Sequence, residues 1–157
     1  MRAAAFIRNI VLLALGSVLV LYLQPLLYQN RILVAEGQVV ETWLDNVYNL
    51  SALLVFAVSV AATLLWHFLG SRSNVLAGKE FGRYRVLWGL IGFAPVLSII
   101  AVLVFINTGA NQAAQVSLTG LLILDVLVLF WLPTATSSPD SVKYVPFGSF
   151  FLRRLVD

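Results

Sequence analysis

The sequence predicts an all-α polytopic membrane protein with four transmembrane helices, on the basis of its composition, four long apolar stretches and the placement of its basic residues. Of the 157 residues, 61% are hydrophobic and 11% are charged, and the mean hydropathy is +0.94. Soluble domains contain roughly 25% charged and about 45–50% apolar residues. A soluble fold of this size would lack the polar residues to cover such a core, so much of the apolar surface is expected to face lipid.

Each apolar stretch is long enough to cross a bilayer as a helix. A helix rises about 1.5 Å per residue and the hydrocarbon layer is roughly 30 Å thick, so about 17–25 residues suffice. The predicted spans cover about residues 10–28, 50–69, 86–106 and 116–132. They form a predicted transmembrane domain over residues 1–132, followed by a cytoplasmic tail over residues 133–157. Spanning strands are excluded because the stretches lack the alternating polar positions of a barrel.

The basic residues gather in alternate connecting segments. The N-terminus, segment 70–85 and the tail hold nine of the ten Lys and Arg residues, whereas segments 29–49 and 107–115 hold only Arg31. With the acids included, the two sides carry formal charges of about +6 and −2. Because Lys and Arg remain on the cytoplasmic side of a membrane, we expect both termini and the middle loop in the cytoplasm. The predicted location is a bacterial inner membrane or an equivalent positive-inside membrane.

The segment after the first span has the apolar period of a helix. Its apolar positions follow i, i+3, i+4 and i+7 spacing and are Val40, Trp43, Leu44 and Val47. This pattern predicts a short amphipathic outer segment, which either lies on the membrane surface or extends the second span outward. Its polar face is acidic, which disfavours attraction to anionic lipid. We therefore expect it to pack on a partner or on the protein's own hairpin.

Aromatic residues flank the predicted spans on both sides. They are Tyr22, Tyr28, Trp43 and Tyr48 on the outer side, and Trp66, Tyr84, Trp88 and Trp131 on the inner side. Trp and Tyr rings favour the headgroup level of a bilayer, where an apolar ring and a polar edge are both accommodated. We interpret these residues as interface anchors.

Asp125 lies near the middle of a predicted span that is otherwise uncharged. An ionised acid at mid-membrane costs about 2.5–3.5 kcal/mol, so we expect this carboxyl to be protonated, hydrogen-bonded, or turned to a polar interior or partner. Counting helix rise places Asp125, Ser17 and Thr63 at a similar depth, roughly 10 Å from the cytoplasmic ends. This predicts a carboxyl–hydroxyl cluster that joins spans one, two and four. Its role is left open between a contact within the bundle, a contact to another subunit, and ion or proton handling.

His67 is predicted to lie about 6 Å closer to the cytoplasmic surface than Asp125. Its neighbours Trp66 and Phe68 are aromatic, which favours an interfacial histidine. The alternative is a proton relay from His67 to Asp125 within the same intramembrane polar cluster.

The middle loop of the predicted bundle is basic and is expected on the cytoplasmic side. The middle loop carries Arg72, Lys79, Arg83 and Arg85, which we interpret as residues that set the topology. A contact with anionic lipid is the alternative, because cytoplasmic leaflets are negative.

The tail combines aromatic and basic residues after a turn-rich stretch. Its candidate contact residues are Tyr144, Phe147, Phe150, Phe151, Arg153 and Arg154. This composition is typical of a membrane-surface anchor or of a segment that packs on the protein itself. A docking segment for a cytoplasmic protein partner is the equal alternative.

Several functional classes are excluded by the residues that are missing. The chain has no cysteine and a single histidine, which excludes thiolate catalysis, cysteine metal sites and multi-histidine metal centres. We expect no cofactor, no catalytic or metal site, and no nucleic-acid partner. The leading hypothesis is a non-enzymatic accessory, scaffold or assembly subunit of a larger membrane complex, in contact with lipid and with other subunits or its own copies. The alternative is a small oligomeric channel or transporter that uses Asp125.

Overall fold

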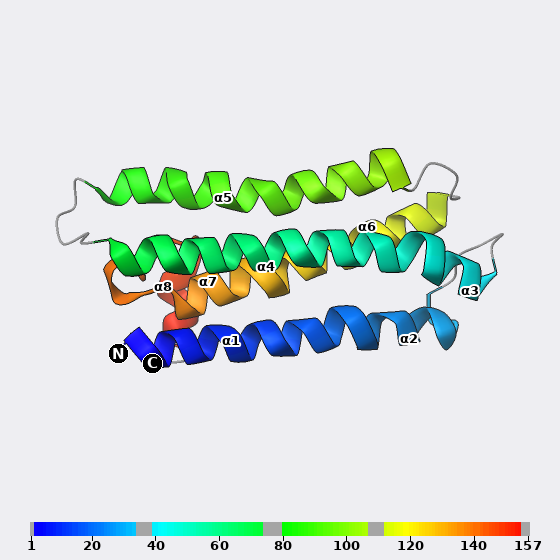
Figure 1. The fold of residues 1–157 in the computed structure, drawn as a ribbon, viewed down its shortest axis with the longest axis horizontal. Helices are drawn as coiled ribbons and strands as arrows, with labels where there is room; N and C mark the ends of the chain where they lie inside the picture. Colours follow the sequence, from blue (N-terminus) through cyan, green and yellow to red (C-terminus); the bar gives the residue numbers. More distant parts are fainter. Residues whose placement is uncertain (1, 34–38, 74–79, 107–111, 155–157) are drawn as a thin grey trace.

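The computed structural model describes residues 2–33, 39–73, 80–106 and 112–154, and every regular element within these ranges is helical. Four helices in the described ranges are long and apolar enough to cross a membrane. They are Ala3–Gln29, Val40–Arg72, Phe81–Ile106 and Gln112–Ser137. The helices lie lengthwise beside one another in an elongated bundle, as Figure 1 shows. The prediction of an all-α fold with four helices long and apolar enough to span a membrane is confirmed.

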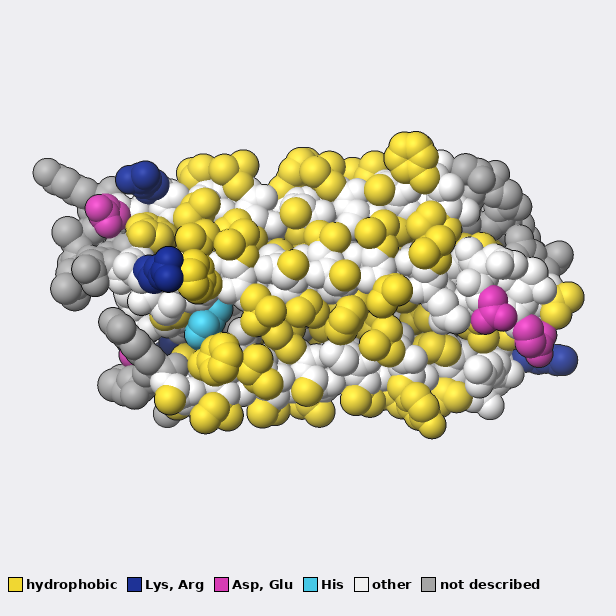
Figure 2. All heavy atoms as spheres, viewed as in Figure 1, with side chains coloured by type: hydrophobic (Ala, Val, Ile, Leu, Met, Phe, Trp, Pro, Cys, Tyr) yellow, Lys and Arg dark blue, Asp and Glu magenta, His cyan; other side chains and the backbone are white. Residues whose placement is uncertain are grey.

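The bundle has two ends that differ in charge. The described chain begins and ends at the same end of the bundle (Figure 1), which we call the terminal end. We call the opposite end of the bundle the far end. Figure 2 shows apolar side chains along the whole visible face, with charged side chains confined to its two ends. Residues such as Leu15, Leu90 and Phe105 are more than half exposed, which suits a surface in contact with lipid.

Each spanning helix consists of α-helical parts joined to one five-residue π-helical segment. The first contains α1 (Arg2–Val18), η1 (Leu19–Leu23) and α2 (Gln24–Gln29), and the second contains α3 (Val40–Trp43), η2 (Leu44–Tyr48) and α4 (Asn49–Arg72). The third contains α5 (Phe81–Ala101) and η3 (Val102–Ile106), and the fourth contains α6 (Gln112–Val126), η4 (Leu127–Trp131) and α7 (Leu132–Ser137). In a π-helical turn the amide bonds five residues back, so one extra residue is accommodated. The second helix contacts all three others.

The fourth helix ends later than the predicted residue 132. Pro133 lies in the first turn of α7, and the helix continues to Ser137. Because α7 continues η4 without a break, Pro133 lies inside the spanning helix, where it removes one backbone N–H without ending the helix. Residues 133–137, which the sequence placed in the tail, are therefore part of the spanning helix. The chain beyond them forms the short helices η5 (Asp140–Val142) and α8 (Ser149–Arg153).

Residues 40–48 are the first part of the second helix, so this segment extends the helix that contains α4. Trp43 and Leu44 are buried, and Val40 and Val47 pack against the same core. The apolar period in this segment therefore marks the side that faces the bundle.

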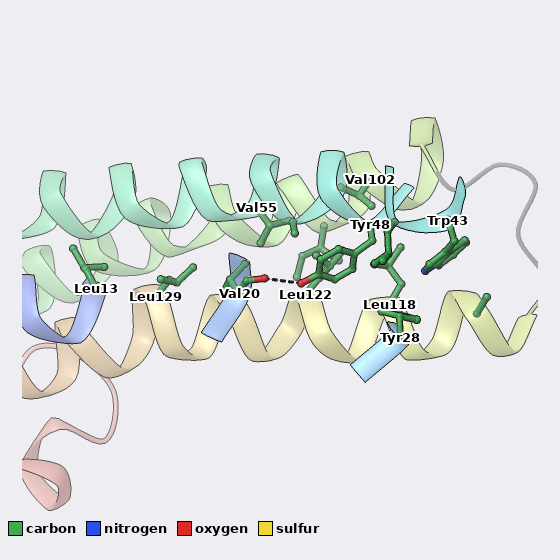
Figure 3. Packing of buried hydrophobic residues seen from close by; sticks show 14 residues of the cluster. Leu13, Val20, Tyr28, Trp43, Tyr48, Val55, Val102, Leu118, Leu122 and Leu129 are labelled. Atoms are coloured by element: carbon green, nitrogen blue, oxygen red, sulfur yellow. Dashed lines mark hydrogen bonds between the residues drawn. The ribbon is translucent and has the colours of Figure 1, made fainter. Parts of the chain in front are cut away.

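Most of the core lies toward the middle and far end of the bundle, and Figure 3 shows its packing. Tyr28, Trp43, Tyr48 and Trp66 are at most 1% exposed. The ring of Tyr28 lies 6.2 Å from that of Trp43 and 5.6 Å from that of Tyr48, both tilted. An interface anchor must expose its ring to lipid, so the anchor interpretation is wrong for these four residues, which form the core instead.

Candidate functional site

The intramembrane acid, Asp125, is fully buried and is bonded to the first helix. Its carboxylate oxygen Oδ1 accepts a hydrogen bond from the Gln24 side-chain amide Nε2 at 2.6 Å. Asp125 is the second-last residue of α6, which η4 follows, and Gln24 is the first residue of α2, directly after η1. Each polar residue thus lies within two residues of a π-helical segment. π-helical turns often occur at functional positions because they reorient a side chain.

Tyr48 connects the second helix to this pair. Its hydroxyl lies 2.8 Å from Gln24 Oε1 and 2.7 Å from the backbone oxygen of Val20. Both oxygens are acceptors, and the single hydroxyl hydrogen can be donated to either of them. The bond to Val20 is drawn in Figure 3. Gln24, Tyr48 and Asp125 are each at most 1% exposed. They form a polar network, closed to solvent, that joins three helices.

The Val20 carbonyl needs this donor because of Pro25. In η1 the amide of Gln24 donates to Leu19, five residues back. In the same register the next amide, at position 25, would donate to Val20, but proline has no N–H. A carbonyl without a donor in hydrocarbon costs several kcal/mol. The Tyr48 hydroxyl replaces the missing amide.

The fourth helix has a related arrangement. Pro133 follows η4 with one residue between them, as Pro25 follows η1. In η4 the amide of Leu132 donates to Leu127, five residues back, so in the same register the amide at position 133 would donate to Val128. The Thr63 hydroxyl donates to the adjacent carbonyl, that of Leu129, at 2.6 Å. Two hydroxyls of the second helix therefore bond backbone carbonyls in π-helical segments that precede a proline, one in the first helix and one in the fourth.

The other members of the predicted intramembrane cluster lie elsewhere. The Ser17 hydroxyl donates to the Leu13 carbonyl of its own helix at 2.7 Å. His67 lies near the terminal end, with its ring 5.4 Å from that of Phe6. The structure thus brings Asp125 to Gln24, and it brings Thr63 to the backbone of the helix that carries Asp125. Gln24 was not predicted, although a glutamine beside a proline inside an apolar stretch is the signal that would have indicated it.

The C-terminal segment is bonded to the terminal end of the bundle. The Trp66 indole donates to the Ser138 hydroxyl at 2.8 Å, and the Ser141 hydroxyl donates to the Gly70 carbonyl at 2.7 Å. Arg153 is buried and donates to the Ser138 carbonyl. These bonds fix the path of the chain after the fourth helix.

This segment then turns back along the fourth helix. The Trp131 indole donates to the Phe147 carbonyl at 3.0 Å, and α8 packs against α7. Trp131 lies six residues before the end of α7, which is about 9 Å along a helix. The turn requires Gly148, whose φ is +78°, a conformation that favours glycine.

Four aromatic side chains of the C-terminal segment point away from the bundle. They are 51–72% exposed, form the surface that we call the aromatic face, and are Tyr144, Phe147, Phe150 and Phe151. The Phe150 ring lies 6.2 Å from that of Tyr144 and 5.7 Å from that of Phe151. Of the predicted tail residues, Arg154 approaches the Phe150 ring at 6.0 Å, whereas Arg153 faces the bundle.

The basic residues of the middle loop are spread over two helices. The Arg72 guanidinium lies 3.9 Å above the Phe68 ring in α4, while Arg83 and Arg85 are exposed in the first turns of α5. Lys79 lies outside the described residues. Among the described residues, no three His, Asp or Glu side chains come close enough to hold a metal ion.

No protein-family model, curated protein or solved structure matches this chain.

Proposed function

We propose that this protein is a non-enzymatic accessory or assembly subunit of a larger membrane complex, which binds a protein partner through its aromatic face. The observation that carries the proposal is that this face is exposed while its backbone is fixed to the bundle by side-chain hydrogen bonds. Exposed, rigidly held aromatic side chains are typical of residues that contribute most to protein interfaces.

The position of Arg153 favours a protein partner over a lipid anchor. In a lipid anchor, basic side chains extend toward headgroup phosphates while the apolar side enters the bilayer. Arg153 is 5% exposed and donates to the Ser138 carbonyl, so it helps to hold the segment in place. A segment that only needs to enter lipid has no need of so many fixed contacts.

Removing two rings of the aromatic face should separate the protein from its partner. We expect wild-type protein, purified in mild detergent, to co-purify at fixed stoichiometry with one membrane protein, and Phe147→Ala/Phe151→Ala to lose it without loss of helix content. Phe105→Ala is the matched control, because Phe105 is 80% exposed but lies in η3 at the far end. A monodisperse wild-type chain without a partner, or equal loss in both variants, would contradict the proposal.

We propose that the terminal end faces the cytoplasm, because most basic residues belong to it. The chain has no cysteine, so a single introduced cysteine supplies the only thiol that a maleimide can label. Glu41→Cys at the far end and Asp140→Cys at the terminal end both replace exposed acids. An impermeant maleimide added to intact spheroplasts should label Glu41→Cys alone, and both thiols after lysis. Labelling of Asp140→Cys in intact spheroplasts would reverse the orientation.

A small oligomeric channel or transporter is the second candidate, and one observation favours it. The second carboxylate oxygen of Asp125 is buried and has no hydrogen-bond partner among the described residues. If Asp125 served a pathway, Asp125→Asn would abolish ion flux into liposomes. We expect no flux from either the wild type or Asp125→Asn, because Asp125 is closed off by Gln24 and its neighbours.

A further inference from the structure

An open groove crosses the surface between the first and second helices at the terminal end. It has a volume of about 550 Å³ and is lined by Ala3, Phe6, Leu64, His67, Phe68 and Ser71. Its walls are mostly apolar, and its polar groups are the imidazole of His67 and the hydroxyl of Ser71. In Figure 2 the histidine side chain (cyan) is visible on this face among apolar side chains, with basic side chains (dark blue) close by.

Arg72 adds a positive charge at the rim of this groove. Its guanidinium lies 3.9 Å above the ring of Phe68, which is one of the lining residues. An arginine stacked on an aromatic ring is held in place and still presents N–H donors at its edge. The groove therefore has an apolar floor that runs into the membrane-spanning part and a cationic rim near the membrane surface.

We propose that this groove binds one anionic phospholipid. Its acyl chain would lie against Phe6 and Leu64, and its phosphate would accept hydrogen bonds from Arg72. Charge complementarity selects an anionic lipid, because the lining residues and Arg72 include no acid. A second groove, at the start of α5, also contains a basic residue, Arg83, but Glu80 lines it too. The charges of that second groove offset one another, so it offers no comparable selection.

The proposal is tested on the full chain by native mass spectrometry from mild detergent. Phosphatidylglycerol and phosphatidylcholine with identical acyl chains are added in equal amounts, and the retained adducts are counted. We expect the wild type to retain phosphatidylglycerol in preference, by about fivefold, which is the effect of one basic residue near an anionic lipid. Arg72→Gln should abolish this preference.

Arg83→Gln is the matched control, since it removes the same charge from the same end of the bundle. It should leave the preference for phosphatidylglycerol intact. Phe6→Ala should lower the retention of both lipids, because it removes an apolar wall that does not distinguish headgroups. Equal effects of Arg72→Gln and Arg83→Gln would show general surface electrostatics and overturn the proposal, as would a wild type without preference. Neither outcome tests the proposed binding of a protein partner by the aromatic face.

Discussion

Gly16→Val is expected to lower the free energy of unfolding of the bundle by about 1–3 kcal/mol, the usual cost of overpacking a well-packed core. A Cβ atom at position 16 would lie 2.7 Å from Leu129 Cδ2 and 3.2 Å from Val128 Cγ1. Both neighbours belong to η4, so the first and fourth helices would have to move apart. This movement would strain the bond between Gln24 and Asp125. Unfolding in mixed micelles of mild detergent and dodecyl sulfate, followed by circular dichroism, measures the change.

Gly120→Val provides the matched control for Gly16→Val. Gly120 also lies in a spanning helix, but a Cβ atom there would meet nothing within 4 Å. Both substitutions change helix propensity in the same way, so the difference between them isolates the close contact. Leu129→Ala combined with Gly16→Val should recover part of the loss, since it removes the nearest clashing atoms. Equal effects at positions 16 and 120 would mean that the two helices do not pack as described.

Removing a bridging hydroxyl of the second helix is expected to cost about 1–2 kcal/mol, since each deletion removes a buried hydrogen bond between helices. Tyr48→Phe removes the donor to Val20 and Gln24, and Thr63→Val removes the donor to Leu129. Both replacements nearly preserve side-chain shape, so packing changes little. The same detergent unfolding assay measures these losses.

Two control substitutions match these deletions. The Thr119 hydroxyl donates to Gln115 of its own helix at 2.7 Å, so Thr119→Val removes no link between helices. Tyr22 is 69% exposed, so Tyr22→Phe leaves the core unchanged. Both controls should stay within about 0.5 kcal/mol of the wild type, as surface changes usually do. Losses at Thr119 as large as those at Thr63 would remove any special role for the bonds between helices.

Hydropathy predicts the helices well because the need to satisfy every backbone group in lipid leaves few alternatives to a helix. The ends of the helices depend on local features that hydropathy does not detect. The fourth helix continues past Pro133 to Ser137, and the Thr63 hydroxyl donates to the Leu129 carbonyl in the turn before this proline. This hydroxyl comes from another helix, 66 residues away along the chain. A sequence pattern within the fourth span could not reveal it.

The position of a helix end also controls the predicted partners of Asp125. The predicted depth of Asp125 assumes that the fourth helix ends at residue 132, but the helix ends at Ser137. Asp125 is therefore about 7.5 Å farther from the end of its helix than predicted. The carboxyl therefore lies deeper than counted, where Gln24 reaches it. The π-helical segments add a further change in register that no apolar period predicts. The aromatic residues illustrate the same limit, since an aromatic ring near a span end can face either lipid or a neighbouring helix.

The Tyr48 and Thr63 hydroxyls give the buried polar groups a structural role. Val20, Leu129 and Gln24 each have a donor or acceptor from another helix. Groups used in this way hold the helices together and leave the interior closed. This closed interior is the reason for placing the functional contacts on the outer surface, at the aromatic face and the lipid groove.

A double-mutant cycle between Pro25 and Tyr48 tests this central claim most directly. Pro25→Ala restores an amide in the first helix, so Tyr48→Phe should cost about 1 kcal/mol less in that background than in the wild type. The crossed pair, Thr63→Val with Pro25→Ala, should be additive. Additivity in both pairs would contradict the claim that the Tyr48 hydroxyl replaces the missing amide.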